Sequence, residues 1–330
     1  MKLVLNMVDI LVFLLCSIDA TGQYTWQHTT ANFNDVKVIR ENEFIIIGDD
    51  GRLNITRDNG KTWRWIETFI KCDFNCITGT EDGKMLIAAD SGYILESSDE
   101  GENWVVEKPL FGDLQKIDVY GDTYYVITAD KAEIFKSTNK GSKWEQVFSA
   151  DSGKFMDLKI INDSVVFACG EGNLLVRTTD GGKTWKNYLE YNEKVKFRTI
   201  DFYNENLGYC AGINEHTYEC FLYKITGKEN EISNIYDTSN QILPLKIKFL
   251  NEKEILSLGA NGKYYLTDNN FNLISGNQLT ANEFYLLKPN QYKYPSLLKL
   301  DFCGSYFVSV GNIFSIAVSQ DSGKTFRLTN

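Results

Sequence analysis

The chain has 330 residues, 43% of them hydrophobic, and a formal net charge of −10 at pH 7. Because the chain is acidic and has no basic stripe, its charge argues against binding to nucleic acid or to anionic membranes. Only four prolines are present and no linker is visible, so we expect residues 21–330 to form one domain. A domain of this length is too large for a single hydrophobic core, which favours a structure built from a repeated unit.

Residues 1–20 have the pattern of a secretory signal. Lys2 precedes an apolar run at residues 10–15, and Ala20 provides a small residue for cleavage. The apolar run is too short to span a bilayer, and we expect no transmembrane segment elsewhere. The pattern predicts a secreted, periplasmic or cell-surface protein whose mature chain starts at Thr21.

Cys16 is a candidate lipid acceptor within this signal. A lipoprotein signal requires a small residue before the modified cysteine, and Leu15 occupies that position. We therefore favour a mature chain without a lipid anchor.

One eight-residue phrase recurs along the chain. Its first copy reads Thr-Arg-Asp-Asn-Gly-Lys-Thr-Trp, and the five copies occupy residues 56–63, 97–104, 137–144, 178–185 and 319–326. In the first four copies, the aromatic residues that end the phrase are successively 41, 40 and 41 positions apart (104−63, 144−104, 185−144). A fixed period of this length indicates a repeat architecture.

The phrase has the chemistry of a tight turn. Its Asp accepts hydrogen bonds from backbone N–H groups just downstream, its Gly supplies a positive φ, and its aromatic residue starts the next strand. The pattern does not match a calcium loop, so we expect a structural role and no bound metal. The residues assigned this structural role are Asp58, Gly60, Trp63, Asp99, Gly101, Trp104, Asn139, Gly141, Trp144, Asp180, Gly182, Trp185, Asp321, Gly323 and Phe326.

Short apolar runs around each phrase allow four strands per repeat. In the first repeat we expect them at residues 35–39, 44–48, 53–56 and 63–67. Three similar repeats follow. A fifth, at 197–223, has lost the phrase, a sixth ends in a decayed copy at 267–271, and a seventh ends in the last full copy.

The phrase resembles the Asp-box, or bacterial neuraminidase repeat. The resemblance implies an all-β fold, a β-propeller of four-stranded antiparallel blades, with the box at the hairpin between the third and fourth strands and away from any active site. We expect seven blades, with six or eight as alternatives.

A propeller ring closes by pairing strands from the two ends of the chain, which removes exposed edges. Trp26 lies 37 residues before Trp63 (63−26) and looks like an outer-strand tryptophan without a box. We expect residues 24–28 to form the closing strand beside residues 326–328.

The resemblance implies that loops between second and third strands open on the face opposite the boxes. These loops supply charged side chains for a ligand, together with aromatic residues on the outer loops 108–111, 188–191 and 291–295. The alternative is that Asp-Gly pairs serve the tight turns alone. The candidate ligand-binding residues are Asp49, Asp50, Arg52, Asp90, Tyr93, Asp130, Lys131, Glu171 and Lys263.

Six of the seven cysteines follow residue 20 (7−1), which permits disulfides in an exported protein. Cys210 and Cys220 flank a hairpin and are the candidate pair. The sequence has no Cys-x-x-Cys motif and only two histidines, so we expect neither a metal nor another cofactor.

Both enzymes and binding proteins carry Asp-boxes. Sialidases need an arginine triad, whereas three of the seven arginines here, Arg57, Arg64 and Arg177, lie in or beside boxes. Xyloglucanase-type hydrolases place two carboxylates between two propellers, and this chain has one. A glycoside hydrolase of either type, working with loop carboxylates, is the alternative function.

Size, blade count and box density resemble the photosystem-II-assembly-factor-like group of exported propellers, and the larger sortilin-type propellers share the box. The resemblance implies a scaffold that binds proteins. Plant and cyanobacterial members of the first group carry an arginine-rich patch, from which this acidic chain departs. We expect a monomeric, non-enzymatic propeller that binds a protein or glycan on its loop face.

Overall fold

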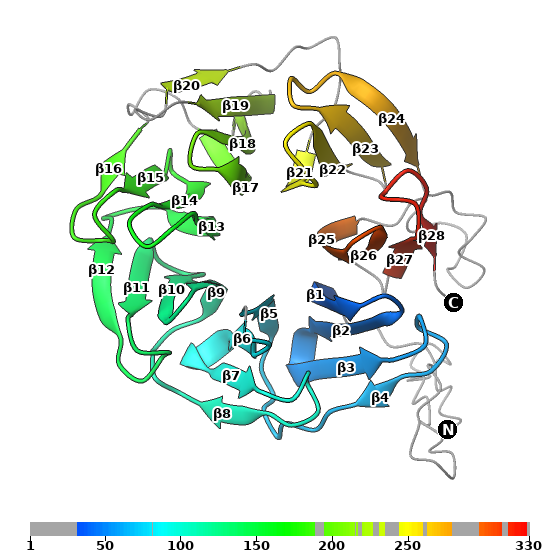
Figure 1. The fold of residues 1–330 in the computed structure, drawn as a ribbon. Helices are drawn as coiled ribbons and strands as arrows, with labels where there is room; N and C mark the ends of the chain where they lie inside the picture. Colours follow the sequence, from blue (N-terminus) through cyan, green and yellow to red (C-terminus); the bar gives the residue numbers. More distant parts are fainter. Residues whose placement is uncertain are drawn as a thin grey trace, which may run out of the picture.

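The structure, a computed structural model, describes residues 32–80, 82–188, 195–214, 216, 220–226, 231–234, 244–259, 263–278, 297–311 and 316–328. Seven four-stranded antiparallel sheets stand around a central axis like the blades of a propeller (Figure 1). In every blade the strands follow chain order from the axis outward. The predicted seven-bladed fold is confirmed, and the alternatives of six and eight blades are wrong.

The blades divide the chain into consecutive segments. Blade 1 consists of β1 (Phe33–Arg40), β2 (Glu43–Gly48), β3 (Arg52–Thr56) and β4 (Arg64–Trp65), and blade 2 of β5 (Phe74–Gly79), β6 (Met85–Ala89), β7 (Ile94–Ser97) and β8 (Val105–Glu107). Blade 3 consists of β9 (Leu114–Tyr120), β10 (Thr123–Thr128), β11 (Glu133–Ser137) and β12 (Glu145–Ser149), and blade 4 of β13 (Lys154–Ile160), β14 (Val166–Glu171), β15 (Leu175–Thr178) and β16 (Lys186–Asn187). Blade 5 consists of β17 (Val195–Asn204), β18 (Leu207–Asn214), β19 (Cys220–Thr226) and β20 (Glu231–Asn234). Blade 6 consists of β21 (Pro244–Phe249), β22 (Glu254–Gly259), β23 (Lys263–Asp268) and β24 (Leu273–Gln278). Blade 7 consists of β25 (Leu297–Cys303), β26 (Tyr306–Gly311), β27 (Ile316–Ser319) and β28 (Arg327–Leu328).

The second strand of each blade is the most apolar because neighbouring blades cover both of its faces. In β2 every residue from Phe44 to Gly48 is buried, and the same holds for all of β6. Such strands read as continuous apolar runs instead of alternating ones. The outer strands β4 and β16 have only two residues each, and Trp65, Lys186 and Asn187 in them are exposed.

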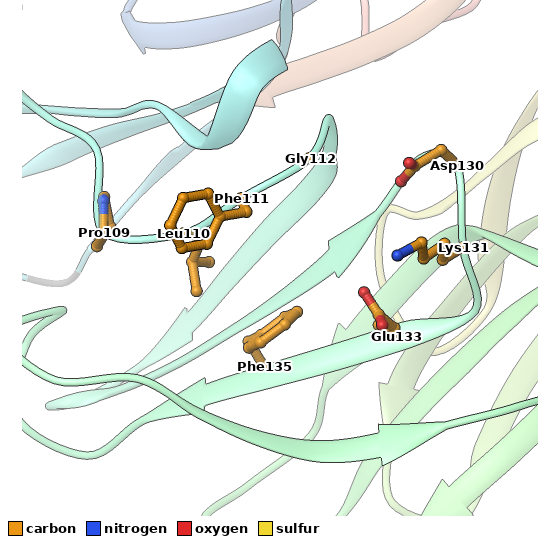
Figure 2. Close-up of a pocket in the computed structure, with 8 residues that line it drawn as sticks. All are labelled: Pro109, Leu110, Phe111, Gly112, Asp130, Lys131, Glu133 and Phe135. Atoms are coloured by element: carbon orange, nitrogen blue, oxygen red, sulfur yellow. The ribbon is translucent and has the colours of Figure 1, made fainter.

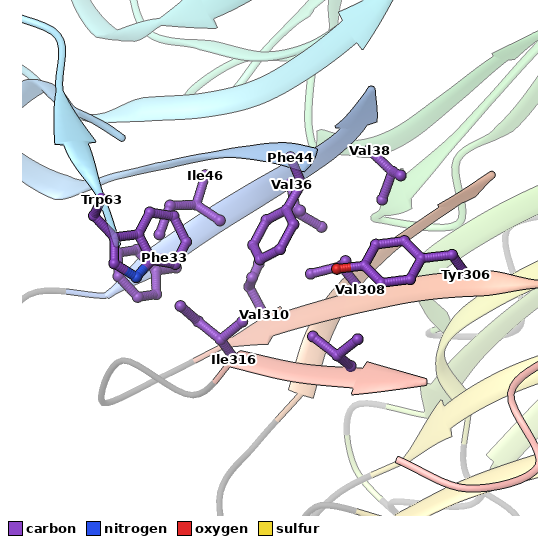
Figure 3. Packing of buried hydrophobic residues seen from close by; sticks show 11 residues of the cluster. Phe33, Val36, Val38, Phe44, Ile46, Trp63, Tyr306, Val308, Val310 and Ile316 are labelled. Atoms are coloured by element: carbon purple, nitrogen blue, oxygen red, sulfur yellow. The ribbon is translucent and has the colours of Figure 1, made fainter. Parts of the chain in front are cut away.

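The first and last blades pack directly against each other. Figure 3 shows Phe44, Val36 and Trp63 of blade 1 against Tyr306 and Val310 of blade 7, all of them buried. The rings of Phe44 and Trp63 meet edge to face at 5.4 Å. This apolar contact joins the two ends of the ring, while the predicted closing strand at 24–28 lies outside the described residues.

The boxes fold as hydrogen-bonded turns. In the first box the Asp58 carboxylate accepts hydrogen bonds from the backbone N–H of Thr62 at 2.8 Å and from the Thr62 hydroxyl at 2.6 Å. The Gly60 N–H donates a hydrogen bond to Thr56 Oγ1 at 2.9 Å. Trp63 Nε1 donates to the Gly60 carbonyl at 3.0 Å. These bonds are internal to the turn, so the side chains that make them serve local structure.

The decayed box in blade 6 keeps half of this arrangement. Asp268 accepts hydrogen bonds from the backbone N–H and the side-chain amide of Asn272, each at 2.8 Å, as Asp99 does from Asn103.

The tryptophans that end the boxes differ in burial. Trp63 is 4% exposed, whereas Trp104 and Trp185 are only half-buried.

The predicted disulfide is wrong. Across β18 and β19, Cys210 lies opposite Tyr223, and Cys220 lies opposite Ile213. The two cysteines are therefore three register positions apart, and both are free thiols.

Candidate functional site

Turns between the second and third strands lie at the opposite end of each blade from the boxes. The turn at 49–51 sits where β1 begins, because the Asp49 N–H donates to the Asn32 carbonyl at 3.2 Å. The first box lies beside the β1–β2 hairpin, because the Asn59 N–H donates to the Asn42 carbonyl at 2.8 Å. We call the end that carries the turns the loop face.

The carboxylates of Asp49 and Asp90 are occupied by local bonds on this face. Asp49 accepts a hydrogen bond from the Asn34 side-chain amide at 3.0 Å, and Asp90 accepts one from Asn75 at 2.7 Å. Asn34 also donates to the Phe74 carbonyl of the next blade, at 3.2 Å. Asp49 and Asp90 therefore orient the two asparagines that connect their blades to the next ones.

Burial shifts the pKa of two predicted site residues, Asp90 and Arg52. The pKa of Asp90 is raised by burial and by the neighbouring carboxylates of Asp113 and Asp73. The pKa of Arg52 is lowered by burial, which the carboxylates of Asp50 and Asp49 partly offset.

The remaining predicted residues are spread over the face. Asp50, Asp130, Lys131 and Lys263 are exposed, whereas Glu171 is half-buried. Glu171 lies 3.5 Å from Lys196 and 3.8 Å from Lys154. The Lys108 ammonium lies 4.9 Å from the centre of the half-buried Tyr93 ring. The structure therefore distributes the nine candidates over several blades instead of joining them in one site.

Asp130 and Lys131 share a groove with an outer loop (Figure 2). The groove has a volume of about 400 Å³ and lies between the loop that follows β8 and the strand β11 with the turn before it. Phe111 on its edge is 88% exposed. The other lining residues are Pro109, Leu110, Gly112, Glu133 and Phe135.

A second phenylalanine projects from the equivalent loop of the preceding blade. Phe69 is 87% exposed, and its φ of +58° is strained for a bulky residue. Both loops pack on the turns of the loop face. A Cβ on Gly51 would meet the Ile70 carbonyl oxygen at 2.0 Å, and one on Gly92 would meet that of Leu110 at the same distance. The glycines are therefore required for this contact.

The other predicted outer loops contribute less. Tyr188 stacks on Phe167 with ring centres 6.5 Å apart, and its hydroxyl accepts a hydrogen bond from Arg177 at 3.1 Å. Residues 189–191 and 291–295 lie outside the described part of the chain.

The central channel holds a second group of polar residues. In all seven inner strands the pairing register shifts near the first residues, and a β-bulge of this kind redirects the side chain that follows it. The upper ring, nearer the loop face, is formed by the residues just after the shift: Asp35, Cys76, Lys116, Asp157, Thr199, Lys246 and Lys299. The lower ring lies two residues further along: Lys37, Thr78, Asp118, Lys159, Asp201, Lys248 and Asp301.

Asp157 is the centre of the ion pairs in the channel. It pairs with Lys116 and, at 2.8 Å, with Lys246, and its side chain is 3% exposed. Burial alone would raise the pKa of Asp157, but the lysines that surround it hold that pKa well below its usual range. The pKa of Lys246 is lowered because burial outweighs the attraction of Asp157.

Our sequence interpretation missed this channel and the exposure of Phe69. The available signal was the recurrence of charged residues two positions apart in otherwise apolar strands, as in Lys116-Ile-Asp118 and Asp157-Leu-Lys159. Because side chains alternate along a strand, such a pair points to one side.

The described ranges contain no group of three or more His, Cys, Asp or Glu residues suited to a metal ion. Within those same ranges, no helix is both long and apolar enough to cross a membrane.

Comparison with known proteins places the chain among Asp-box propellers. Residues 19–159 match the family described as photosynthesis system II assembly factor YCF48. The chain therefore resembles photosystem II assembly factors over 141 of its 330 residues (159−19+1). It is 26% identical over 165 residues to the photosystem II assembly lipoprotein Ycf48 of Synechococcus sp. (strain CC9902), a match that covers 48% of this chain and 50% of that protein. The matched region thus spans about half the length of this relative.

Solved structures show the same fold at low identity. YCF48 bound to D1 peptide is 18% identical, with a TM-score of 0.64, and the match covers 88% of this chain and 93% of that one. An ancestral GH74 enzyme is 14% identical, with a TM-score of 0.68, and the match covers 92% of this chain and 48% of that one. A binding protein and an enzyme share the fold, so function must be argued from the surface.

Proposed function

We propose that this protein is an exported, non-enzymatic propeller that binds an extended segment of a partner protein on the loop face of blades 1 to 3. The observation that carries the proposal is the exposure of Phe69 and Phe111, at 87% and 88%, on equivalent loops of neighbouring blades. Large aromatic side chains on loops over a rigid scaffold are typical contact residues of protein interfaces.

The strain at Phe69 supports the same conclusion. A non-glycine residue at a φ of +58° costs free energy, and here that cost keeps an aromatic ring in solvent. Neither effect helps the isolated protein fold, so both are better explained by a contact that forms on binding.

The groove beside Phe111 indicates what the partner segment presents. Its floor includes Leu110 and Phe135, and its rim carries Asp130, Lys131 and Glu133 (Figure 2). An apolar anchor fits the floor, and basic flanking residues suit two carboxylates on the rim and a protein of net charge −10. A polypeptide ligand is also consistent with the D1 peptide bound to the similar YCF48 propeller.

We extend the proposal to the location of the protein. Residues 1–20 would direct export, and residues 21–330 would form the mature propeller. The relative from Synechococcus is described as a lipoprotein, which supports a site of action outside the cytoplasm.

The test is a selection of peptides from a display library on the purified mature chain, with a glycan array in parallel. We expect enrichment of peptides with an apolar residue between basic residues. Binding confined to glycans, or turnover of sialosides or β-glucans that stops on substitution of a loop carboxylate, would contradict the proposal.

A further inference from the structure

The upper ring of the channel carries more positive charge than its carboxylates neutralise. It contains three lysines and two aspartates, whereas the lower ring contains three of each. The lower ring is therefore balanced, with ion pairs such as Lys37–Asp301 at 2.9 Å and Lys159–Asp201 at 3.5 Å.

Both upper-ring carboxylates are already engaged by the backbone. Asp35 accepts the N–H groups of Val36 and Ile77, each at 3.0 Å. Asp157 accepts those of Leu158 at 3.0 Å and Ile200 at 3.1 Å, in addition to its two lysines. Little capacity is left on these oxygens for a further cation.

Lys299 is the upper-ring lysine that forms no ion pair with Asp35 or Asp157. Among the described residues no carboxylate oxygen lies within 4.0 Å of its ammonium group. Lys299 nevertheless lines the same cavity as Lys116 and Lys246. Its positive charge helps to lower the pKa of both Asp157 and Lys246. Three lysines therefore line this cavity, and Asp157 pairs with two of them.

The channel at this level has room for a small ligand. Its cavity measures about 160 Å³ and is lined by residues of both rings. Lysine ammonium groups act as compact point charges for phosphate-like groups.

We propose that the upper ring binds a small divalent oxyanion of the phosphate class, held by Lys116, Lys246 and Lys299. The site lies inside the channel and involves neither Phe69 nor Phe111, so it is independent of the peptide site on the loop face. Bound there, the anion neutralises the excess charge of the ring and links blades 3, 6 and 7.

Inorganic phosphate is the probe, titrated calorimetrically into the full mature chain in low-salt buffer at pH 7.5, where screening is weak. We expect binding by the wild type and a loss of affinity of about tenfold or more in Lys299→Met, as expected for one charged contact. Lys248→Met removes the same charge from the lower ring and should change the affinity less than about threefold. Lys299→Gln replaces the methionine variant if that variant does not fold.

A second readout separates binding from general stabilisation. Phosphate should raise the thermal midpoint of the wild type and of Lys248→Met, but not that of Lys299→Met. Absence of phosphate binding by the wild type, or equal binding by Lys299→Met, would overturn the proposal.

Discussion

The carboxylate of Asp301 in the last blade accepts a hydrogen bond from the backbone N–H of Val38 in the first blade, at 2.8 Å. The same oxygen lies 2.9 Å from the Lys37 ammonium. Equivalent bonds join other neighbours, such as Asp35 to Ile77 and Asp118 to Ile160. The ring is therefore closed near its axis by the contact that links the other blades.

Asp301→Ala tests this closing contact. The substitution leaves the Val38 N–H and the Lys37 ammonium without their acceptor, and we expect a loss of about 2 kcal/mol in the free energy of unfolding. Hydrogen exchange should become faster in β1 and β25 first. Asp118→Ala removes the same contact inside the ring and should accelerate exchange in β9 and β13 instead. Uniform acceleration in both variants would argue against a specific closing role.

Trp63→Ala tests the boxes as structural elements. Trp63 is 4% exposed and packs on Phe44, so its removal should cost about 3–5 kcal/mol in chemical denaturation. Trp104→Ala, at a half-buried site, should cost less. Equal losses would mean that burial does not determine the contribution of these tryptophans. Peptide binding by the folded fraction should remain unchanged in both variants.

Asp157→Asn tests the ion pairs in the channel. The variant leaves Lys116 and Lys246 without their counter-charge, and a loss of about 3–5 kcal/mol is expected near neutral pH. In the wild type the Asp157 charge holds the pKa of Lys116 above its usual range, although burial alone would lower it. Without Asp157, burial lowers the folded-state pKa values of Lys116 and Lys246. The unfolded variant then binds more protons at alkaline pH, and its stability rises with pH relative to the wild type. Denaturation at pH 7 and pH 10 should therefore show a smaller loss at pH 10. A loss independent of pH would contradict this electrostatic explanation.

The wild type should lose stability in acid. The pKa of Asp99 is lowered to about 2 by the Asn103 backbone and side-chain donors, and that of Asp157 is also lowered. A carboxylate with a lowered folded-state pKa stabilises the fold above its ordinary pKa, and this contribution disappears as the pH falls through the folded value. Stability should therefore decrease from about pH 4 to pH 2, and less steeply in Asp157→Asn. A flat profile in the wild type would contradict this account.

Phe69→Gly should affect stability and binding in opposite directions. Glycine adopts a φ of +58° without strain, so thermal and chemical denaturation should show a gain of about 1 kcal/mol. The loss of the ring should weaken peptide binding at the same time. Phe69→Leu keeps the strain and should leave stability unchanged. A Phe69→Gly variant that is less stable than the wild type would mean that the ring supports the loop.

The spacing of the boxes was sufficient to predict the blades because each box fixes a turn and a strand start through bonds among adjacent residues. The loop-face candidates were less predictable. Asp49 and Asp130 look alike in sequence, yet Asp49 is bonded to Asn34 while Asp130 is exposed beside a groove. That difference depends on contacts between loops, which turn chemistry does not encode.

The channel rings and the failed disulfide have a similar explanation. A bulge in each inner strand decides which residue points to the axis, and register decides that Cys210 faces Tyr223 instead of Cys220. Both are properties of strand pairing and cannot be read from the spacing of the residues alone.

The most direct test of the central claim is the affinity of a library-selected peptide for Phe111→Ala, measured beside the wild type. Leu273→Ala is the matched control, because Leu273 is 57% exposed on the outer strand of blade 6. The account predicts that Phe111→Ala weakens binding about tenfold or more, as for an aromatic anchor, and that Leu273→Ala leaves it unchanged. Equal affinity in the wild type and Phe111→Ala would contradict it and remove the loop face of blades 1 to 3 as the binding site.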